Sequence, residues 1–280
     1  MMIGLVIDSS SQIPADLVEE FEVEVVPITV TIDDDSFREG VDIDADAFYE
    51  MVAEPLPEIG TSQPSPGEFL QAFEALTARG AEEILCVTMA DKHSGTFNSA
   101  RIAGDISPVP VRLVNSQTMS FGVTACFWEA AAAISDGTDL ETAALRAEAL
   151  APNICSTFLL QSLDQMRKMG RVDFDALAPD IDEVGVYVTR GVAVDVAGAG
   201  STIEELSELM LAQVPTDIAI RTGVCLAAPE MLPYSEILEK ELATRDNMLG
   251  TVRYRVGPSV AAHTGPGTAG LFWWPVVDSV

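Results

Sequence analysis

The chain has few basic residues. It has 15 Lys and Arg against 44 Asp and Glu, which gives a formal net charge of −29 at neutral pH. Nucleic acids and anionic lipid surfaces are bound through clustered Lys and Arg, so this balance argues against both classes of partner. The excess of acid indicates a well-solvated surface, and adaptation to high salt is an alternative that the composition leaves open.

The residues that form metal and disulfide sites are also scarce. The chain has two histidines, no C-x-x-C pair and only four widely spaced cysteines, which are Cys86, Cys126, Cys155 and Cys225. A zinc site needs several such ligands at close spacing, so we expect no metal site. Three of the cysteines lie within apolar runs, which indicates reduced thiols and favours the cytoplasm.

The sequence shows neither an export signal nor a membrane segment. The chain opens into the strand-like run Ile3–Ile7 without a basic start, which is unlike a signal peptide. The most apolar candidate, residues 123–134, is too short for a transmembrane helix and contains Glu129. We therefore expect a cytoplasmic protein without an integral membrane segment.

Strand-like and helix-like runs alternate in the first half of the 280 residues. Strands are expected over Val23–Thr31, Ile84–Thr88 and Val111–Val114, and helices over Thr96–Ile106 and Phe121–Ser135. This rhythm is typical of a mostly parallel sheet flanked by helices. We expect a first α/β domain with such a sheet over residues 1–152.

The second half has strand candidates that follow one another with short links. They run over Ser156–Gln161, Val184–Val188, Val192–Val196, Asp217–Ala227, Leu249–Arg255 and Gly270–Val277. This order is typical of a mixed sheet with helices on one side. We therefore expect a second α/β domain over residues 153–280.

Thr61 precedes an expected helix start. It lies in an expected loop ahead of Ser65-Pro66-Gly67-Glu68, which has the pattern of a capping box with Pro at the first helical position. The N–H groups and dipole of such a helix start favour an anion, and the Thr61 hydroxyl could add a hydrogen bond. An ordinary polar loop is the competing interpretation.

Ser94-Gly95-Thr96 follows the strand Ile84–Thr88 and opens the next expected helix. Ligands of α/β sheets bind at the carboxyl edge of the strands, where such junctions lie. Gly95 has no Cβ, so a ligand oxygen could approach the backbone, and the Ser94 hydroxyl could donate to it. No lysine follows as in a phosphate-binding loop. The alternative is that Ser94 only caps the helix.

His263 and Ser9 are two further candidates. His263 is followed by a glycine-rich turn, Gly265-Pro266-Gly267, and its imidazole could donate to a carboxylate. Ser9 follows the first strand and would lie at the same sheet edge as Ser94. A structural histidine and a locally bonded serine are the competing interpretations.

Taken together and in this order, these stretches resemble the DegV family, the fatty-acid-binding subunits of bacterial fatty acid kinase. The motifs that carry the resemblance are Ile7-Asp8-Ser9, Thr61–Ser65, Ser94–Ala100 and His263–Gly267. The resemblance implies two α/β domains with a long-chain fatty acid between them. It also implies that the carboxylate is held by Thr61, Ser94, the Gly95 amide and His263. We expect the site to be lined further by Ser62, Thr96 and Ser9.

The resemblance further implies a non-catalytic carrier that has no cofactor and presents the carboxylate to a separate kinase. The sequence departs from the family after Arg171, where Asp195–Ser201 stands in place of a basic segment. The one dense basic stretch contains Arg167, Lys168 and Arg171. It marks either a partner surface or local pairing with neighbouring acids.

An acyl hydrolase is the alternative function. Ser94 would be the nucleophile, His263 the base, and glycine amides the oxyanion hole. The sequence around Ser94 lacks the G-x-S-x-G nucleophile elbow, and no carboxylate that would orient His263 can be named. The sequence therefore favours the carrier.

Overall fold

Two units, each with its own sheets, make up the residues that the computed structural model describes, which are 2–52, 57–160, 184–191 and 193–276. The first unit comprises Met1–Asp44 and Pro57–Pro152, and the second comprises Ala45–Leu56 and Asn153–Val280. The expected class, two α/β domains with a parallel and a mixed sheet, is confirmed. The basic residues Arg167, Lys168 and Arg171 lie outside the described residues.

A four-stranded parallel sheet forms the centre of the first unit, in the order β2-β1-β6-β7. Its strands are β1 (Ile3–Asp8), β2 (Glu24–Val26), β6 (Glu83–Thr88) and β7 (Val111–Asn115). The strands β1 and β6 are nearly continuous apolar runs, as expected for strands that are buried on both faces.

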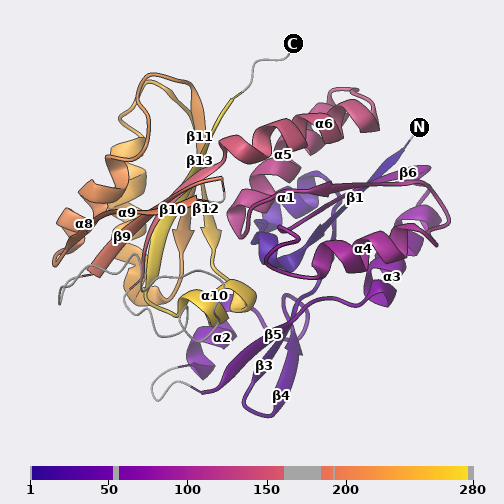
Figure 1. Ribbon diagram of the computed structural model, residues 1–280, viewed down its shortest axis with the longest axis horizontal. Coiled ribbons are helices and arrows are strands. Elements are labelled where there is room, and N and C mark those ends of the chain that lie inside the picture. Colours follow the sequence, from indigo (N-terminus) through magenta and orange to yellow (C-terminus); the bar gives the residue numbers. More distant parts are fainter. Residues whose placement is uncertain (1, 53–56, 161–183, 192, 277–280) are drawn as a thin grey trace. The chain divides into compact units, whose positions relative to one another are not determined.

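Helices cover both faces of this sheet (Figure 1). The helices α3 (Pro66–Ala78) and α4 (Thr96–Gly104) pack together on one face, and α5 (Phe121–Ser135) and α6 (Leu140–Leu150) pack together on the other. The short helix α1 (Ala15–Glu20) follows the 3-10 turn η1 (Ser9–Ser11), and a second 3-10 turn, η2 (Ala151–Asn153), follows α6.

A separate three-stranded antiparallel sheet also belongs to the first unit, in the order β4-β3-β5. It consists of β3 (Thr29–Ile32), β4 (Asp35–Arg38) and β5 (Ile59–Ser62). The expectation of one strand over Val23–Thr31 is therefore wrong, because the chain leaves the parallel sheet after Val26. Pro27 has no N–H to donate to a ladder, and the Ile28 N–H donates to the Ser9 hydroxyl at 2.9 Å instead.

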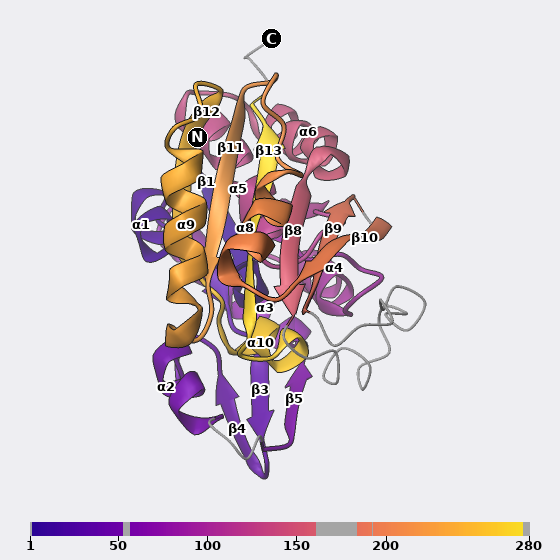
Figure 2. The same ribbon diagram turned by 90° about the vertical axis from the view of Figure 1, so that its left-hand side faces the viewer.

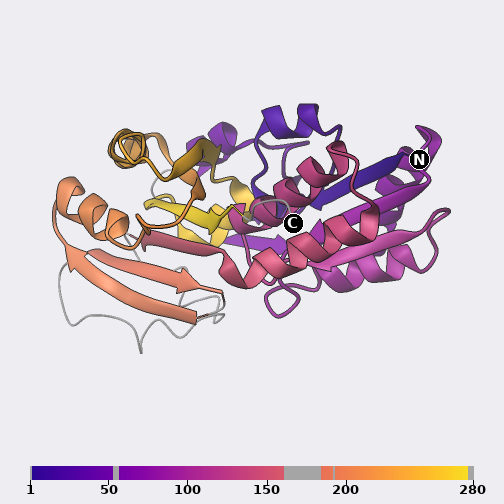
Figure 3. The ribbon, with the colours of Figure 1, turned by 90° about the horizontal axis from the view of Figure 1, so that it is seen from above.

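The second unit contains a six-stranded mixed sheet in the order β10-β9-β8-β13-β11-β12. Only β11 and β12 are parallel among its pairs. The strands are β8 (Cys155–Leu160), β9 (Val184–Arg190), β10 (Ala193–Gly200), β11 (Ile220–Leu226), β12 (Met248–Arg255) and β13 (Thr268–Pro275). Figure 3 shows β9 and β10, in orange, running side by side at one edge of the sheet.

The helices α8 (Ile203–Leu211) and α9 (Leu232–Leu242) pack against each other and against this sheet (Figure 2). The 3-10 turn η3 (Pro229–Met231) leads into α9, and α10 (Pro258–Thr264) lies between β12 and β13. The helix α2 (Ala45–Met51) comes from the first half of the chain, and the Tyr49 hydroxyl donates to the Val256 carbonyl at 2.9 Å. Arg255 also binds Asp46, so two polar contacts hold α2 in the second unit.

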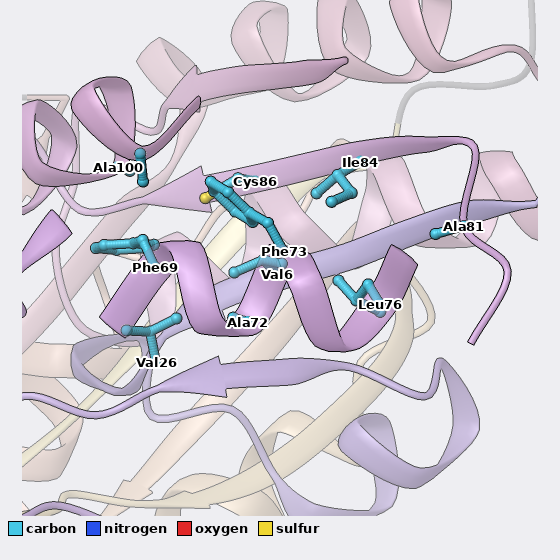
Figure 4. Packing of buried hydrophobic residues seen from close by; sticks show 11 residues of the cluster. Val6, Val26, Phe69, Ala72, Phe73, Leu76, Ala81, Ile84, Cys86 and Ala100 are labelled. Atoms are coloured by element: carbon cyan, nitrogen blue, oxygen red, sulfur yellow. The ribbon is translucent and has the colours of Figure 1, made fainter. Parts of the chain in front are cut away.

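An apolar core lies between α3 and the parallel sheet (Figure 4). Phe69, Phe73 and Leu76 project from α3 toward Val6 of β1 and Ile84 of β6, and each of these side chains is buried. Burying each large apolar side chain stabilises the fold by roughly 1.5–3 kcal/mol, which explains why this helix is fixed on the sheet. The position of α3 in turn fixes the end of β5, which leads into it.

Replacement of Phe73 by alanine removes a fully buried ring from this core. Because such a change leaves a cavity, we expect the free energy of unfolding to fall by about 3–5 kcal/mol, measured by urea denaturation. The control is Leu145→Ala on α6, where the side chain is 52% exposed. The control is expected to change the free energy by less than about 0.5 kcal/mol, and equal losses in the two variants would contradict the assigned core.

Candidate functional site

The buried carboxylate of Asp8 lies at the carboxyl end of β1. Its Oδ1 accepts a hydrogen bond from the Ser10 N–H at 3.1 Å and another from the Ser10 hydroxyl. Its Oδ2 accepts from the N–H of Met89, directly after β6, at 3.0 Å. One carboxylate therefore connects the segments that follow two neighbouring strands of the parallel sheet.

Burial determines the protonation behaviour around Asp8. It raises the pKa of Asp8 above the ordinary value of 3.8, although the hydrogen bonds from Ser10 and Met89 act in the opposite direction. Burial also raises the pKa of the neighbouring Cys86 thiol well above its usual value, and the charge of Asp8 adds to this effect. Cys86 therefore stays a neutral thiol at physiological pH.

Ser9 takes part in a second buried network beside Asp8. Its hydroxyl donates to Glu39 Oε2 at 2.5 Å and accepts the Ile28 N–H at 2.9 Å. The Gln12 side chain donates to the Ser9 carbonyl at 3.0 Å. These contacts direct the Ser9 hydroxyl toward Glu39 and the backbone that leaves the parallel sheet.

The turn Ser94-Gly95-Thr96 opens α4 at the same edge of the sheet. The hydroxyls of Ser94 and Thr96 lie 2.8 Å apart, and the Thr96 N–H donates to Ser94 Oγ at 3.3 Å. Gly95 is the N-cap residue of this nine-residue helix and has no side-chain oxygen to offer its N–H groups. A bound anion could accept from them in place of a capping side chain.

Thr61 lies on the strand β5, so the expectation that it is in a loop is wrong. It pairs with Val30 of β3, and the exposed Ser62 pairs with Thr29. The alternation of β-branched Ile59 and Thr61 was a weak signal for this strand. The strand leads directly to α3, whose predicted capping box at Ser65 is confirmed by both of its hydrogen bonds.

His263 lies in the last turn of the helix α10, which the sequence analysis missed. Pro258 occupies the start of this helix, and Gly265 follows its end with φ +77°. This pairing of Pro at the start and Gly after the end is a sequence signal that could have revealed the helix. The Thr268 hydroxyl donates to the Gly265 carbonyl at 3.1 Å, which fixes the turn that follows His263.

The structure thus places Ser9, Thr61, Ser62, Ser94, Gly95 and Thr96 in the first unit and His263 in the second. Within the first unit, Ser94, Gly95 and Thr96 lie together at the start of α4. A residue that the sequence analysis did not consider, Gln63, connects this turn to the end of β5. Its side-chain nitrogen donates to Ser99 Oγ on α4 at 3.2 Å.

Strained backbone also occurs at this edge of the parallel sheet. Three non-glycine residues in the segments that follow β1 and β7 have positive φ angles, namely Gln12 at 58°, Gln117 at 53° and Ser120 at 52°. Such conformations cost of order 1–3 kcal/mol each and cluster at ligand sites. Glu22 and Asp33, each at 51°, adopt the same conformation in turns elsewhere, so it is not confined to this edge.

No group of three or more His, Cys, Asp or Glu side chains among the described residues could hold a metal ion. No helix in the described part of the chain combines the length and apolar character needed to cross a bilayer.

The fold and these strand ends define an α/β protein with hydroxyl groups gathered at the carboxyl edge of a parallel sheet. The family model described as "Uncharacterised protein, DegV family" matches residues 2–176. The chain belongs to the DegV family. A DegV domain-containing protein from Streptomyces coelicolor is 28% identical over 279 residues, which cover 96% of this chain and 97% of the relative.

Solved structures show the same fold. A structure described as the fatty acid binding of a DegV family protein from Thermus thermophilus has a TM-score of 0.88 and 26% identity, with 99% of this chain and 100% of that chain covered. A stearic acid-binding protein from Eubacterium ventriosum has a TM-score of 0.83 and 22% identity, with 98% of both chains covered. At that identity the second match shows the fold alone.

The raised pKa of Asp8 predicts a pH signature in an Asp8→Asn variant. Because the folded protein retains this proton at pH values where the unfolded chain has lost it, Asp8 contributes less stability as pH rises above 3.8. We expect the unfolding free energy of the wild type minus that of the variant to fall as pH rises from about 4 to 7. Urea denaturation at several pH values measures this difference.

The control is Asp139→Asn at the start of α6, where the Thr142 N–H lowers the pKa of the exposed carboxyl. There the same difference is expected to stay nearly constant over this range and to fall only as pH drops below about 4, because a lowered pKa gives a stabilisation that is complete above the unfolded value. A difference that rises with pH for Asp8→Asn would show that the fold stabilises the Asp8 anion.

Proposed function

We propose that this chain binds a long-chain fatty acid and holds its carboxylate with Thr61, Ser94, the Gly95 amide and His263. The observation that carries the proposal is the turn at the start of α4, where a pair of hydroxyls and an N-cap glycine stand at a sheet edge. The full-length similarity to the Thermus thermophilus protein, which is described as binding fatty acid, supports the choice of ligand.

The carboxylate contacts set the position of the ligand. A carboxylate accepts strong hydrogen bonds from hydroxyl, amide and imidazole donors, and these must offset the cost of removing the charge from water. The Ser94 and Thr96 hydroxyls share one hydrogen bond, in which one of them donates and the other accepts. The accepting hydroxyl keeps its own proton and could donate it to a bound carboxylate. His263 enters the proposal through its motif, with an imidazole held at the end of α10.

The acyl tail supplies most of the affinity. Each buried methylene contributes about 0.8 kcal/mol, so a tail of roughly 15 carbons offers on the order of 10 kcal/mol before the costs of ordering. The net charge of −29 repels a fatty acid anion at long range. Salt screens this repulsion beyond roughly 8–10 Å, so hydrogen-bond donors at contact distance can determine whether the fatty acid anion binds.

We also propose that the chain acts in the cytoplasm as a non-catalytic carrier for a separate kinase. A carboxylate oxygen of the bound ligand would attack the γ-phosphorus of ATP on the kinase, with release of ADP and formation of an acyl phosphate.

We expect hydroxylamine trapping to yield the fatty acyl hydroxamate only when carrier, kinase, ATP and fatty acid are all present. Hydroxamate formation by this chain and ATP without the kinase would contradict the assignment.

Replacement of Ser94 by alanine tests the carboxylate site. A hydrogen bond to a charged group contributes about 1.5–3 kcal/mol, so we expect fatty acid affinity to fall roughly 10- to 100-fold, measured by calorimetry. Affinity for the fatty alcohol of the same chain length should change little, because it lacks the carboxylate. His263→Ala should act in the same direction.

The control for these variants is Ser36→Ala, which removes an exposed hydroxyl that contacts Thr31 on the hairpin of β3 and β4. It should leave the affinity unchanged. Full affinity in the Ser94→Ala, His263→Ala double variant would contradict the assigned site. Labelling of Ser94 by a serine-reactive phosphonate would instead support the hydrolase alternative.

A further inference from the structure

The side chain of Gln63 lies against Gly95, a contact that the sequence gives no reason to expect. A Cβ atom built on Gly95 would lie 2.0 Å from Gln63 Oε1 and 2.6 Å from both Cδ and Nε2 of the same residue. The three nearest heavy atoms therefore all belong to the Gln63 amide, which lies directly against the Gly95 backbone. The space that a methyl group would need at this position is already filled.

The conformation of Gly95 does not itself require glycine. Its φ of −74° is negative and its ψ is 4°, so the backbone does not lie in the left-handed region that favours glycine. The requirement is spatial, because no real Cβ contact is as short as 2.0 Å. The expected reason for glycine was that a ligand oxygen could approach the backbone, whereas the structure shows the Gln63 amide against it.

Gln63 also spans the first turn of α4. Its Nε2 donates to Ser99 Oγ at 3.2 Å, and Ser99 is 3% exposed. The Ser99 N–H in turn donates to the Gly95 carbonyl at 3.0 Å. The amide of an otherwise exposed side chain thus contacts both ends of the turn that begins with Gly95.

The contact between Gln63 and Gly95 joins two segments that each carry a proposed carboxylate donor. Gln63 follows β5 directly and lies two residues after Thr61, while Gly95 is adjacent to Ser94. We propose that Gln63 is a positioning residue that holds the Thr61 strand end against the Ser94-Gly95 turn, and that position 95 is glycine to admit its amide. This inference rests on the proposed function, because Thr61 and Ser94 are the hydroxyls whose spacing it would set.

A double-mutant cycle tests the proposal. An alanine at position 95 would displace the flexible Gln63 amide, so Gly95→Ala and Gln63→Ala should have the same effect. We expect each to weaken fatty acid binding about tenfold and the double variant to weaken it by the same factor, because both remove one contact. Affinity for the matching fatty alcohol should stay within about twofold, since only the carboxylate donors are displaced.

The matched control is Gly67→Ala on α3, where the nearest heavy atom to the added Cβ is Ser65 Oγ at 3.7 Å. It should bind like the wild type. Independent losses that multiply to about a hundredfold in the double variant would overturn the proposal, because a methyl group at position 95 would then weaken binding by a route other than displacement of the Gln63 amide. Wild-type affinity in Gln63→Ala would overturn it as well.

Thermal unfolding of the same four proteins separates this proposal from the proposed function. Gly95→Ala should lower the Tm by about 2–4 °C in the wild type and cause no further drop in the Gln63→Ala background. Equal drops in both backgrounds would disprove the contact whether or not fatty acid binds. If the wild type binds no fatty acid, the proposed function is wrong, and the thermal cycle still decides whether Gln63 packs on Gly95.

Discussion

The buried carboxylate of Asp8 is the constraint on which the arrangement of the parallel-sheet edge depends. A carboxylate removed from water must have its oxygens satisfied, and here both accept hydrogen bonds, from Ser10 on one side and Met89 on the other. These donors belong to the segments that follow β1 and β6. The requirement to satisfy the oxygens of one buried carboxyl group therefore fixes the backbone that leads toward the Ser94 turn.

The hydroxyls at this edge follow from the fixed backbone. Ser9 is directed into a network with Glu39, whereas Ser94 and Thr96 stand at the start of a helix that glycine leaves without a side-chain cap. An anion at such a helix start gains from the dipole and from unused N–H groups. Among the described residues, hydroxyl and backbone N–H groups are thus the donors that the start of α4 offers to such an anion.

Strong local signals in the sequence predicted most of the fold. The strands β1, β6 and β7 and the mostly apolar helix α5 appeared where the pattern placed them. The prediction of a single strand over Val23–Thr31 was wrong, because Pro27 divides this segment between two sheets. Thr61 was misplaced because pairing with β3 depends on a partner 31 residues away. The contact of Gln63 with Gly95 was not predictable, since it depends on how close two loops pack.

We propose that this chain is a fatty acid carrier, and native mass spectrometry of the purified protein would show whether it is. Solvent extraction and lipid analysis of the same sample would identify the ligand. We expect one long-chain fatty acid bound to each chain, either co-purified or taken up on addition. A protein that is empty and also fails to bind added fatty acids would show that it is not a fatty acid carrier.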